Sequence, residues 1–378
     1  MTVLAILGAF WGDEGKGKVA LKLTREDDIC ARYQGGPNAA HTVHLNSSKY
    51  IFRMIPAGIL GAKYGLLGSG MVLNPSMLLE EIEMVSQIGS NLVGRLVISD
   101  RAHIICPKHI EQDSRGNSTS IGTTRMGVGP CYADKIGRTG IRVGDLEKKE
   151  VRTNFSPEFR LIVDQLLSRV GRQIVNSQEF VRKHLDLGGR VIAEGAQGAL
   201  LDIDHGDYPF VTSSNTTIGG VCTGLGVTPL DMEPPLVIAS AYMTKVGGGS
   251  FPSRVDGELS RFLQEKGDER DNATGLLREC GWIDSASLKW ACLINGTKNV
   301  VLTKLDVLSG APKLSVVKCD KQLQIIEGWQ QDIAQLRSWG DLPKALLNYV
   351  SLIEQEADCR VVAITNGPDN DNYIEREQ

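Results

Sequence analysis

The sequence predicts an α/β protein with a mainly parallel central sheet flanked by helices, and two observations support this. Short apolar runs alternate with amphipathic stretches along the 378 residues, which is typical of parallel strands joined by helices. Glycine- and Thr/Ser-rich loops follow several of the apolar runs, and long loops of this kind tend to carry function. Because no linker or internal repeat interrupts the chain, we expect a single large domain over residues 1–378.

Each strand is predicted from a short apolar run bounded by polar or glycine residues. The predicted strands are Val3–Leu7, Thr42–Leu45, Leu96–Ser99, Arg190–Ala193, Leu236–Ser240, Val300–Thr303 and Val361–Thr365. The predicted helices are Ser76–Gln87, Ser156–Leu185 and Leu342–Gln355. For the second helix, Ser156 is a typical N-cap, Pro157 suits the first turn, and apolar residues recur at helical spacing from Phe159 to Ile174.

Composition narrows the class of protein. Hydrophobic residues make up 42% and charged residues 23% of the chain, as in ordinary globular proteins. A net charge of −4 argues against broad attraction to nucleic acid or to an anionic membrane. No apolar run approaches the roughly 20 residues of a membrane span. Eight scattered cysteines without a CxxC pair favour reduced thiols and a cytoplasmic location.

The loop Gly12-Asp-Glu-Gly-Lys-Gly-Lys18 follows the first predicted strand and opens a helix. Backbone N–H groups at such a turn bind anionic oxygens, so the loop predicts a phosphate site like that of P-loop NTPases. In a Walker A motif the lysine is followed by Ser or Thr, whereas here Lys16 is followed by Gly17. The loop is therefore not a standard Walker A motif. Asp13 is a candidate metal ligand or general base, since Mg²⁺ favours a carboxylate together with phosphate oxygens.

Other loops carry further candidates. His41 lies in a polar glycine loop with few apolar neighbours in sequence, which favours a general acid or phosphate donor over a structural role. Ile121-Gly-Thr-Thr124 offers hydroxyls and amides to a phosphate. Gln197 follows a predicted strand and would lie at the carboxyl edge of the sheet, where α/β proteins bind ligands. Taken singly, each of these loops could be structural.

Taken together and in order, the loops resemble the adenylosuccinate synthetase family, from residue 2 to about residue 369. The matching motifs are Trp11-Gly-Asp-Glu-Gly-Lys-Gly-Lys18, Gln34-Gly-Gly with Asn38 and His41-Thr42, Ile121-Gly-Thr-Thr124 with Gly129-Pro130, Glu194-Gly-Ala-Gln-Gly198, Leu201-Asp-Ile-Asp-His-Gly206 with Tyr208-Pro209, Val211-Thr-Ser-Ser-Asn215, Thr303-Lys-Leu-Asp306 and Gly367-Pro-Asp369.

The resemblance implies a ligase that joins L-aspartate to C6 of a 6-oxopurine nucleoside monophosphate through a 6-phosphoryl intermediate. The family normally uses IMP as the acceptor and GTP as the phosphoryl donor. Asp13 would remove the N1 proton and bind Mg²⁺, with Ala40 as a second ligand. His41 and Lys16 would assist phosphoryl transfer to O6, and Gln197 would stabilise the developing oxyanion.

The resemblance also implies the binding residues. The acceptor nucleotide would contact Asn38, Thr123, Thr124, Arg138, Thr212 and Val246; the nucleoside triphosphate would contact Glu14, Gly15, Gly17, Lys18, Lys304, Asp306 and Gly367; L-aspartate would contact Thr274, Arg278 and Arg125. Arg138 matches an arginine that reaches the neighbouring site, which implies a homodimer. Lys304 and Asp306 match the residues that read guanine, although an aspartate can also accept from adenine, so ATP or dATP stays open as the donor.

The chain departs from the family pattern around L-aspartate. The family carries an arginine run after Thr-Gly, and this chain has Leu276-Leu277-Arg278 there. In the family, the arginine at the place of Leu276 contacts both L-aspartate and the ribose 2′-hydroxyl. Arg125-Met126 stands where Gly-Arg is usual, so a second arginine is displaced by one position.

Three hypotheses follow from these departures. In the favoured one the acceptor is dGMP, as in the phage branch that makes 2-aminoadenine DNA, since dGMP has no 2′-hydroxyl for the missing arginine. In the second, the chain is an ordinary synthetase that uses IMP and holds L-aspartate through Arg125 and Arg278. In the third it is a catalytically silent nucleotide-binding paralogue, which the presence of Asp13 and His41 disfavours.

Overall fold

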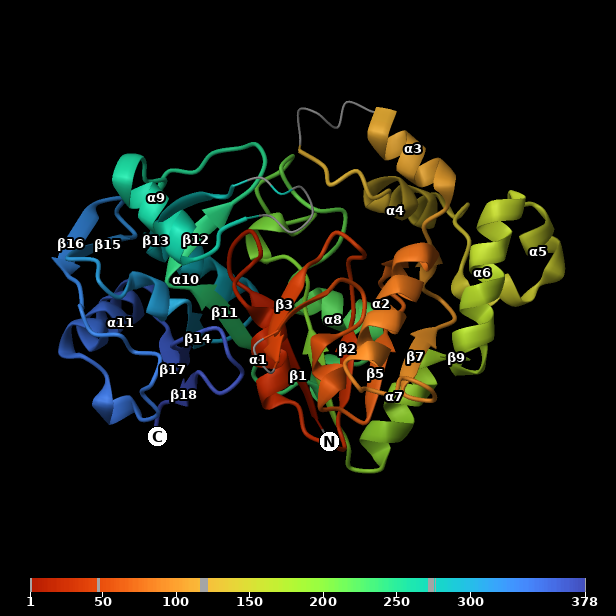
Figure 1. Cartoon of the computed structure of the whole chain (residues 1–378), viewed down its shortest axis with the longest axis horizontal. Coiled ribbons are helices and arrows are strands. Elements are labelled where there is room, and N and C mark those ends of the chain that lie inside the picture. Colours follow the sequence, from red (N-terminus) through yellow and green to blue (C-terminus); the bar gives the residue numbers. More distant parts are fainter. Residues whose placement is uncertain (1, 46–47, 116–121, 271–274, 276, 378) are drawn as a thin grey trace.

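The structure is a computed structural model that describes residues 2–45, 48–115, 122–270, 275 and 277–377. Its centre is a ten-stranded sheet in which β17 and β18 pair antiparallel and the other neighbours pair parallel (Figure 1). In spatial order the strands are β18 (Tyr373–Glu375), β17 (Arg360–Thr365), β14 (Asn299–Thr303), β11 (Leu236–Ser240), β1 (Thr2–Gly8), β10 (Arg190–Glu194), β2 (Ile29–Arg32), β5 (Tyr64–Leu67), β7 (Leu96–Ser99) and β9 (Ile174–Val175). The predicted α/β class with a mainly parallel sheet is confirmed.

The strands predicted from apolar runs are all present, and six of them, β1, β7, β10, β11, β14 and β17, lie in this sheet. The sequence patterns did not single out β2 and β5. Each is four residues long, and Arg32, Tyr64 and Gly65 interrupt their apolar character. Strands from both ends of the sequence join one sheet, while the single domain over residues 1–378 stays a prediction.

Helices connect the strands and cover the sheet. They are α1 (Lys16–Leu23), α2 (Pro75–Gln87), α3 (Pro107–Arg115), α4 (Val128–Gly137), α5 (Lys149–Thr153), α6 (Pro157–Val170), α7 (Ser177–Asp186), α8 (Ile218–Leu225), α9 (Gly257–Lys266), α10 (Ser285–Ile294) and α11 (Lys344–Ala357). Two predicted helices, now α2 and α11, are confirmed with ends shifted by one or two residues. Asn74 starts α2, because its side chain accepts from the backbone N–H groups of Ser76 and Met77.

The prediction of one helix over Ser156–Leu185 is wrong. The predicted N-cap is present, and the Ser156 hydroxyl accepts from the Phe159 N–H. The helix ends at Val170, a 3₁₀ turn follows, and Ile174 belongs to the edge strand β9. Asn176 then caps a new helix, α7. Strand pairing of β9 with β7 therefore overrides the helical spacing of the apolar residues.

Smaller sheets lie beside the central one. One contains β12 (Tyr242–Lys245), β13 (Glu279–Asp284), β15 (Lys313–Val317) and β16 (Leu323–Glu327); the two-stranded sheets pair β3 (His41–Leu45) with β4 (Ser48–Phe52) and β6 (Val72–Leu73) with β8 (His103–Ile104). Figure 1 shows the four-stranded sheet with α9 on one side of the molecule and α3 to α6 on the other. One large hydrophobic core contains residues of α10, α11 and the four-stranded sheet. Another packs α2 against α6 on the opposite side of the molecule.

Within the described ranges, no helix combines the length and the apolar character that crossing a membrane requires. All eight cysteines are free thiols.

Candidate active site

A cavity of about 900 Å³ opens at the carboxyl edge of the central sheet. Its walls come from the segments that follow β1, β10, β14 and β17, together with the loop after α9. Parallel strands end at the same edge, so residues far apart in sequence meet there, as is usual for ligand sites in α/β folds.

The cavity brings together most of the residues that the sequence predicted as a site. Those that line it are Asp13, Gly15, Lys16, Gly17, Lys18, Asn38, Ala40, His41, Thr123, Thr124, Gln197, Thr212, Val246, Arg278, Lys304, Asp306 and Gly367. Glu14, Arg125 and Arg138 are described residues that do not line it. Thr274 and Leu276 lie outside the described residues.

Glu14 shapes the glycine loop from behind. Its side chain is fully buried, and Oε1 accepts from the backbone N–H groups of Phe10 (2.9 Å) and Gly12 (3.0 Å). Its other oxygen accepts from Lys16 Nζ at 2.5 Å. The carboxylate thus fixes the turn and the position of Lys16, so of the two acids in the loop Asp13 is the one that faces the cavity.

Three of the site residues have a left-handed backbone conformation. φ is +64° at Asp13, +54° at Gln197 and +60° at Lys304. Each follows a strand of the central sheet directly or within a few residues. Such a conformation is unfavourable for a residue with a side chain, and it persists at functional sites where the surrounding structure enforces it.

His41 begins β3 and is held by a buried carboxylate. Its Nδ1 is hydrogen-bonded to Glu194 Oε1, and Glu194, the last residue of β10, is fully buried. Burial, reinforced by the charge of Arg32, lowers the pKa of His41, although Glu194 opposes the shift. Burial alone would raise the pKa of Glu194, but the hydrogen bond with His41 and the charge of Arg32 hold it below its ordinary value. A neutral imidazole beside an ionised carboxylate can take up a proton when an anionic substrate group approaches.

Gly17 allows α1 to approach this histidine. A Cβ at position 17 would lie 2.7 Å from His41 Cβ and 3.3 Å from Cγ. The glycine after Lys16, which departs from a Walker A motif, is therefore required by a close contact within the site.

The far end of the cavity offers polar groups without protein partners. Both amide atoms of Gln197 are inaccessible to solvent and have no hydrogen-bond partner within the described part of the chain, and the same is true of Asn38 Oδ1. Asn38 Nδ2 lies 3.4 Å from Thr212 Oγ1, so two residues predicted to hold the same phosphate are neighbours. An unsatisfied buried amide is costly, so these groups favour a bound polar ligand.

At the opposite end, Lys18 and Asp306 lie near Gly367. Lys18 Nζ donates to the carbonyl oxygens of Gly367 (2.5 Å) and Asn372 (3.0 Å), and burial lowers its pKa to about 8. Burial also raises the pKa of Asp306. Lys18, Asp306 and Gly367, three of the residues predicted to bind the nucleoside triphosphate, thus form one region of the wall.

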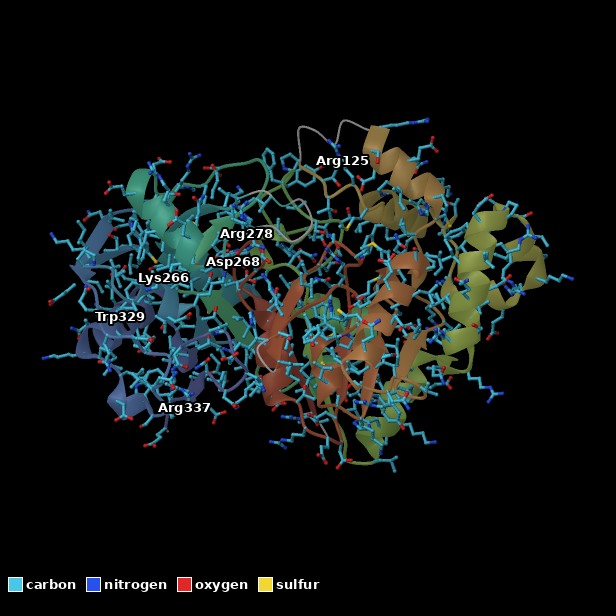
Figure 2. The ribbon with its side chains drawn as sticks, viewed as in Figure 1. Arg125, Lys266, Asp268, Arg278, Trp329 and Arg337 are labelled. Carbon is cyan, nitrogen blue, oxygen red and sulfur yellow. The ribbon has the colours of Figure 1, made fainter. Side chains whose placement is uncertain are left out.

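The arginines differ in their surroundings. Arg278 is almost fully buried, and its Nε lies 2.9 Å from Asp13 Oδ2. Arg125 is exposed and lies toward α3 and α4, away from Arg278 (Figure 2). Arg138 is also exposed and ends α4 with φ +63°. The roles predicted for Arg125 and Arg138 stay predictions.

The polar groups of the cavity fit a Mg²⁺ ion that binds together with a substrate phosphate. The described residues contain no cluster of three His, Cys, Asp or Glu side chains that could hold a metal alone. Asp13 and Ala40 both line the cavity, and one carboxylate with a backbone carbonyl suits Mg²⁺ when substrate phosphates and water complete the octahedron.

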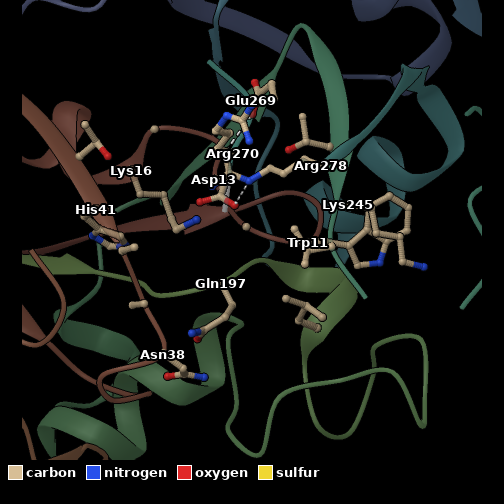
Figure 3. A pocket seen from close by; sticks show the side chains of 18 of the residues that line it. Trp11, Asp13, Lys16, Asn38, His41, Gln197, Lys245, Glu269, Arg270 and Arg278 are labelled. Atoms are coloured by element: carbon tan, nitrogen blue, oxygen red, sulfur yellow. Dashed lines mark hydrogen bonds and ion pairs between the residues drawn. The ribbon is translucent and has the colours of Figure 1, made fainter. Parts of the chain in front are cut away.

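Two functional candidates escaped the sequence patterns. Glu194 belongs to the motif Glu194-Gly-Ala-Gln-Gly198, and its place as a carboxylate at the end of a buried strand could have indicated a role. Glu269 follows α9 and is fully buried, and it contacts Arg278, Lys304 and Tyr242 (Figure 3). Its partners are distant in sequence, so no local pattern pointed to it.

Comparison with known proteins supports the same assignment. The family model described as adenylosuccinate synthetase matches residues 5–319 and 314–374. The adenylosuccinate synthetase of Salinibacter ruber is 38% identical, over 99% of this chain and 98% of that protein. The structure of the fully ligated adenylosuccinate synthetase of Plasmodium falciparum is 33% identical, covers both chains completely and has a TM-score of 0.89.

A more distant solved structure shares the fold. The succinoaminodeoxyadenylate synthetase of cyanophage S-2L, bound to dGMP and dATP, has a TM-score of 0.72 at 20% identity, over 100% of this chain and 96% of that one. The family model and the relative from Salinibacter ruber both extend over most of the sequence. The chain therefore belongs to the adenylosuccinate synthetase family, whose members are carbon–nitrogen ligases.

Proposed function

We propose that the protein joins L-aspartate to C6 of IMP and uses GTP as the phosphoryl donor. The observation that carries this proposal is the single cavity in which Asp13, His41 and Gln197 lie with Lys304 and Asp306. These are the groups that a purine acceptor and a guanine-bearing donor require, and the relatives at 33–38% identity are adenylosuccinate synthetases. This changes the preference drawn from the sequence, which favoured dGMP.

In the first step, Asp13 accepts the N1 proton of the 6-oxopurine, and negative charge develops on O6. The unpartnered amide of Gln197 is available to donate to that oxygen. O6 then attacks the γ-phosphorus, the bond to the β–γ bridging oxygen breaks, and the nucleoside diphosphate leaves. Mg²⁺, bound with Asp13 and Ala40, would neutralise phosphate charge during this transfer.

His41 would act on the transferred phosphoryl group. An anionic oxygen beside the ring raises the pKa of the imidazole, and Glu194 stabilises the imidazolium that results. In the second step the amine of L-aspartate attacks C6 and phosphate leaves. Arg278, near Asp13, is the described arginine of the predicted L-aspartate site that lines the cavity.

The assay is phosphate release by the purified protein with L-aspartate and Mg²⁺. IMP, GMP, dGMP and dIMP are each tested with GTP, ATP and dATP. We expect turnover with IMP and GTP. Turnover restricted to dGMP would overturn the proposal, and nucleotide binding without turnover in any pair would favour a silent paralogue.

A second candidate acceptor is dGMP, and the observation that favours it is Leu276 in the place of the family arginine. The variant Leu276→Arg tests it directly. If position 276 faces the ribose, the substitution raises kcat/KM for ribonucleotides relative to deoxyribonucleotides. An unchanged preference would remove this argument for dGMP.

We also propose that the enzyme is a homodimer in which Arg138 completes the neighbouring site. Arg138 is exposed, and Ile136 beside it is 78% exposed. Sedimentation gives the oligomeric state. In a mixture of inactive Arg138→Ala and inactive Asp13→Ala proteins, subunit exchange should restore activity, and a lack of recovery would count against the shared site.

A further inference from the structure

Glu269 occupies an unusual position for a carboxylate. It lines the cavity wall with a side chain that is fully buried. Oε2 accepts from Arg278 at 2.9 Å, and Oε1 accepts from Lys304 Nζ and from the Tyr242 hydroxyl, both at 2.5 Å. One carboxylate thus holds two cations that come from different segments of the chain.

The contacts continue to Asp13. Arg278 forms an ion pair through Nη1 with Glu269 and another through Nε with Asp13 Oδ2, both at 2.9 Å (Figure 3). A continuous series of ion pairs therefore runs from Asp13 through Arg278 and Glu269 to Lys304. Asp13 belongs to the acceptor end of the cavity, and Lys304 to the end predicted for the donor base.

The series is balanced in charge, with two carboxylates and two cations. Burial would raise the pKa of Glu269, but Lys304 and Arg278 hold it below its ordinary value, so the group is ionised. Removing a charge from water costs several kcal/mol unless its partners are well placed. A fully buried carboxylate with three partners therefore constrains where those partners can lie.

We propose that Glu269 is a positioning residue that couples the two ends of the site, so that a ligand at Lys304 changes the hold of Arg278 on Asp13. The inference rests on the proposed function for the identity of the two ligands. Lys304 and Arg278 share one carboxylate, so a ligand that draws Lys304 away leaves more of the negative charge of Glu269 to Arg278. Arg278 then binds Asp13 less strongly, and Asp13 is available to the acceptor.

Coupling between two sites is reciprocal and is measured as a factor between dissociation constants, about 5–150-fold in typical cases. The probes are IMP and GDP, which cannot transfer a phosphoryl group to each other. Calorimetry gives the dissociation constant of GDP with and without saturating IMP. We expect IMP to tighten GDP binding in the wild-type protein by a factor within this range, and Glu269→Gln to bring the factor close to one.

Two further variants separate coupling from stability. Glu81→Gln is the matched control, because Glu81 is also buried and accepts from the backbone N–H groups of Arg53, Met54 and Ile55, outside the cavity. It should lower the melting temperature and leave the coupling factor unchanged. If Glu269→Gln does not fold, Glu269→Asp keeps the charge but is one methylene too short to hold both cations, and it should also reduce the factor.

The inference is overturned if the wild type shows no coupling, or if Glu269→Gln and Glu269→Asp both keep the wild-type factor. A wild-type protein that binds IMP and GDP but turns over no substrate contradicts the proposed function alone. Full turnover with unchanged coupling in the Glu269 variants contradicts the positioning role alone.

Discussion

Two fully buried carboxylates, Glu194 and Glu269, support side chains of the cavity wall, and they differ in what they hold. Glu194 ends a strand of the central sheet and pairs with His41, an imidazole that can gain a proton when an anionic group approaches. Glu269 lies in the loop after α9 and forms ion pairs with Arg278 and Lys304. The Glu194–His41 pair is therefore suited to the proton transfer that we propose, and the group around Glu269 is suited to hold ion pairs in place.

The departures from the family pattern are also unevenly distributed. Asp13, Lys16, His41 and Gln197, which match the family, follow strands of the central sheet or begin β3. In the sequence, Leu276 and Leu277 come shortly before β13 of the four-stranded sheet. The residues proposed for the reaction are therefore positioned by the central sheet, whereas these two departures precede a strand of the smaller sheet in the sequence.

The largest expected effect is at Asp13, which belongs to the acceptor end of the cavity. Asp13→Ala removes the proposed base and the partner of Arg278. We expect phosphate release to fall by on the order of 10³-fold, within the usual range for a general base. The melting temperature, measured alongside, should stay near that of the wild type. Substantial remaining activity would remove Asp13 from the mechanism.

Glu194→Gln tests the role of Glu194 as the partner of His41 and leaves Glu269 unchanged. The amide keeps the size of the side chain but cannot stabilise an imidazolium, so kcat should fall about 10–100-fold, as when a group that orients a histidine is lost. The KM for GTP should change little. An equal loss through KM, with kcat preserved, would mean that Glu194 shapes binding, and the contrast with Glu269 would disappear.

Gly17→Ala adds a Cβ that would contact His41 and changes no charged group. Alanine favours a helix over glycine by about 1 kcal/mol, but its Cβ would meet His41 Cβ at 2.7 Å. We expect kcat to fall by on the order of tenfold and the melting temperature to fall as well, because overpacking of about 1–3 kcal/mol outweighs the helix propensity of alanine. Gly219→Ala in α8 is the matched control, since the described residues leave its Cβ position open. Equal kinetics for the two variants would show that His41 yields to the contact.

The smallest expected effect is on the pH dependence of the unfolding free energy of the nucleotide-free protein, in which His41 and Glu269 should differ. The folded pKa of His41 lies below its ordinary 6.5, so the unfolded chain binds more protons and stability falls as pH drops through 6.5. Glu194 and Glu269 have pKa values lowered from 4.5, so the stability they contribute is lost only below that value. Between pH 6.5 and 4.5, His41→Gln should reduce the pH dependence of the unfolding free energy and Glu269→Gln should not. The opposite ranking in denaturant titrations would contradict this assignment.

The sequence predicted what depends on neighbours along the chain. Apolar runs located most of the central strands, and the polar loop after one of them placed Gln197 at the carboxyl edge of the sheet, whereas Lys304 was assigned through the resemblance to the family. Contacts between distant segments were out of reach. Glu269 became a candidate only when α9, β12 and β14 brought Tyr242 and Lys304 to it. The break after Val170 was missed because the pairing of β9 with β7 is a tertiary contact, although Gly171 and Asn176 were local signals for it.

The contact of Lys18 with residues 367 and 372 also bears on the order in which the protein is made. The phosphate loop and α1 leave the ribosome early, yet the carbonyls that receive the Lys18 ammonium are about 350 residues later in the chain. During most of synthesis this lysine has neither acceptor. A chain that stops before residue 367 therefore lacks both carbonyls that receive the Lys18 ammonium.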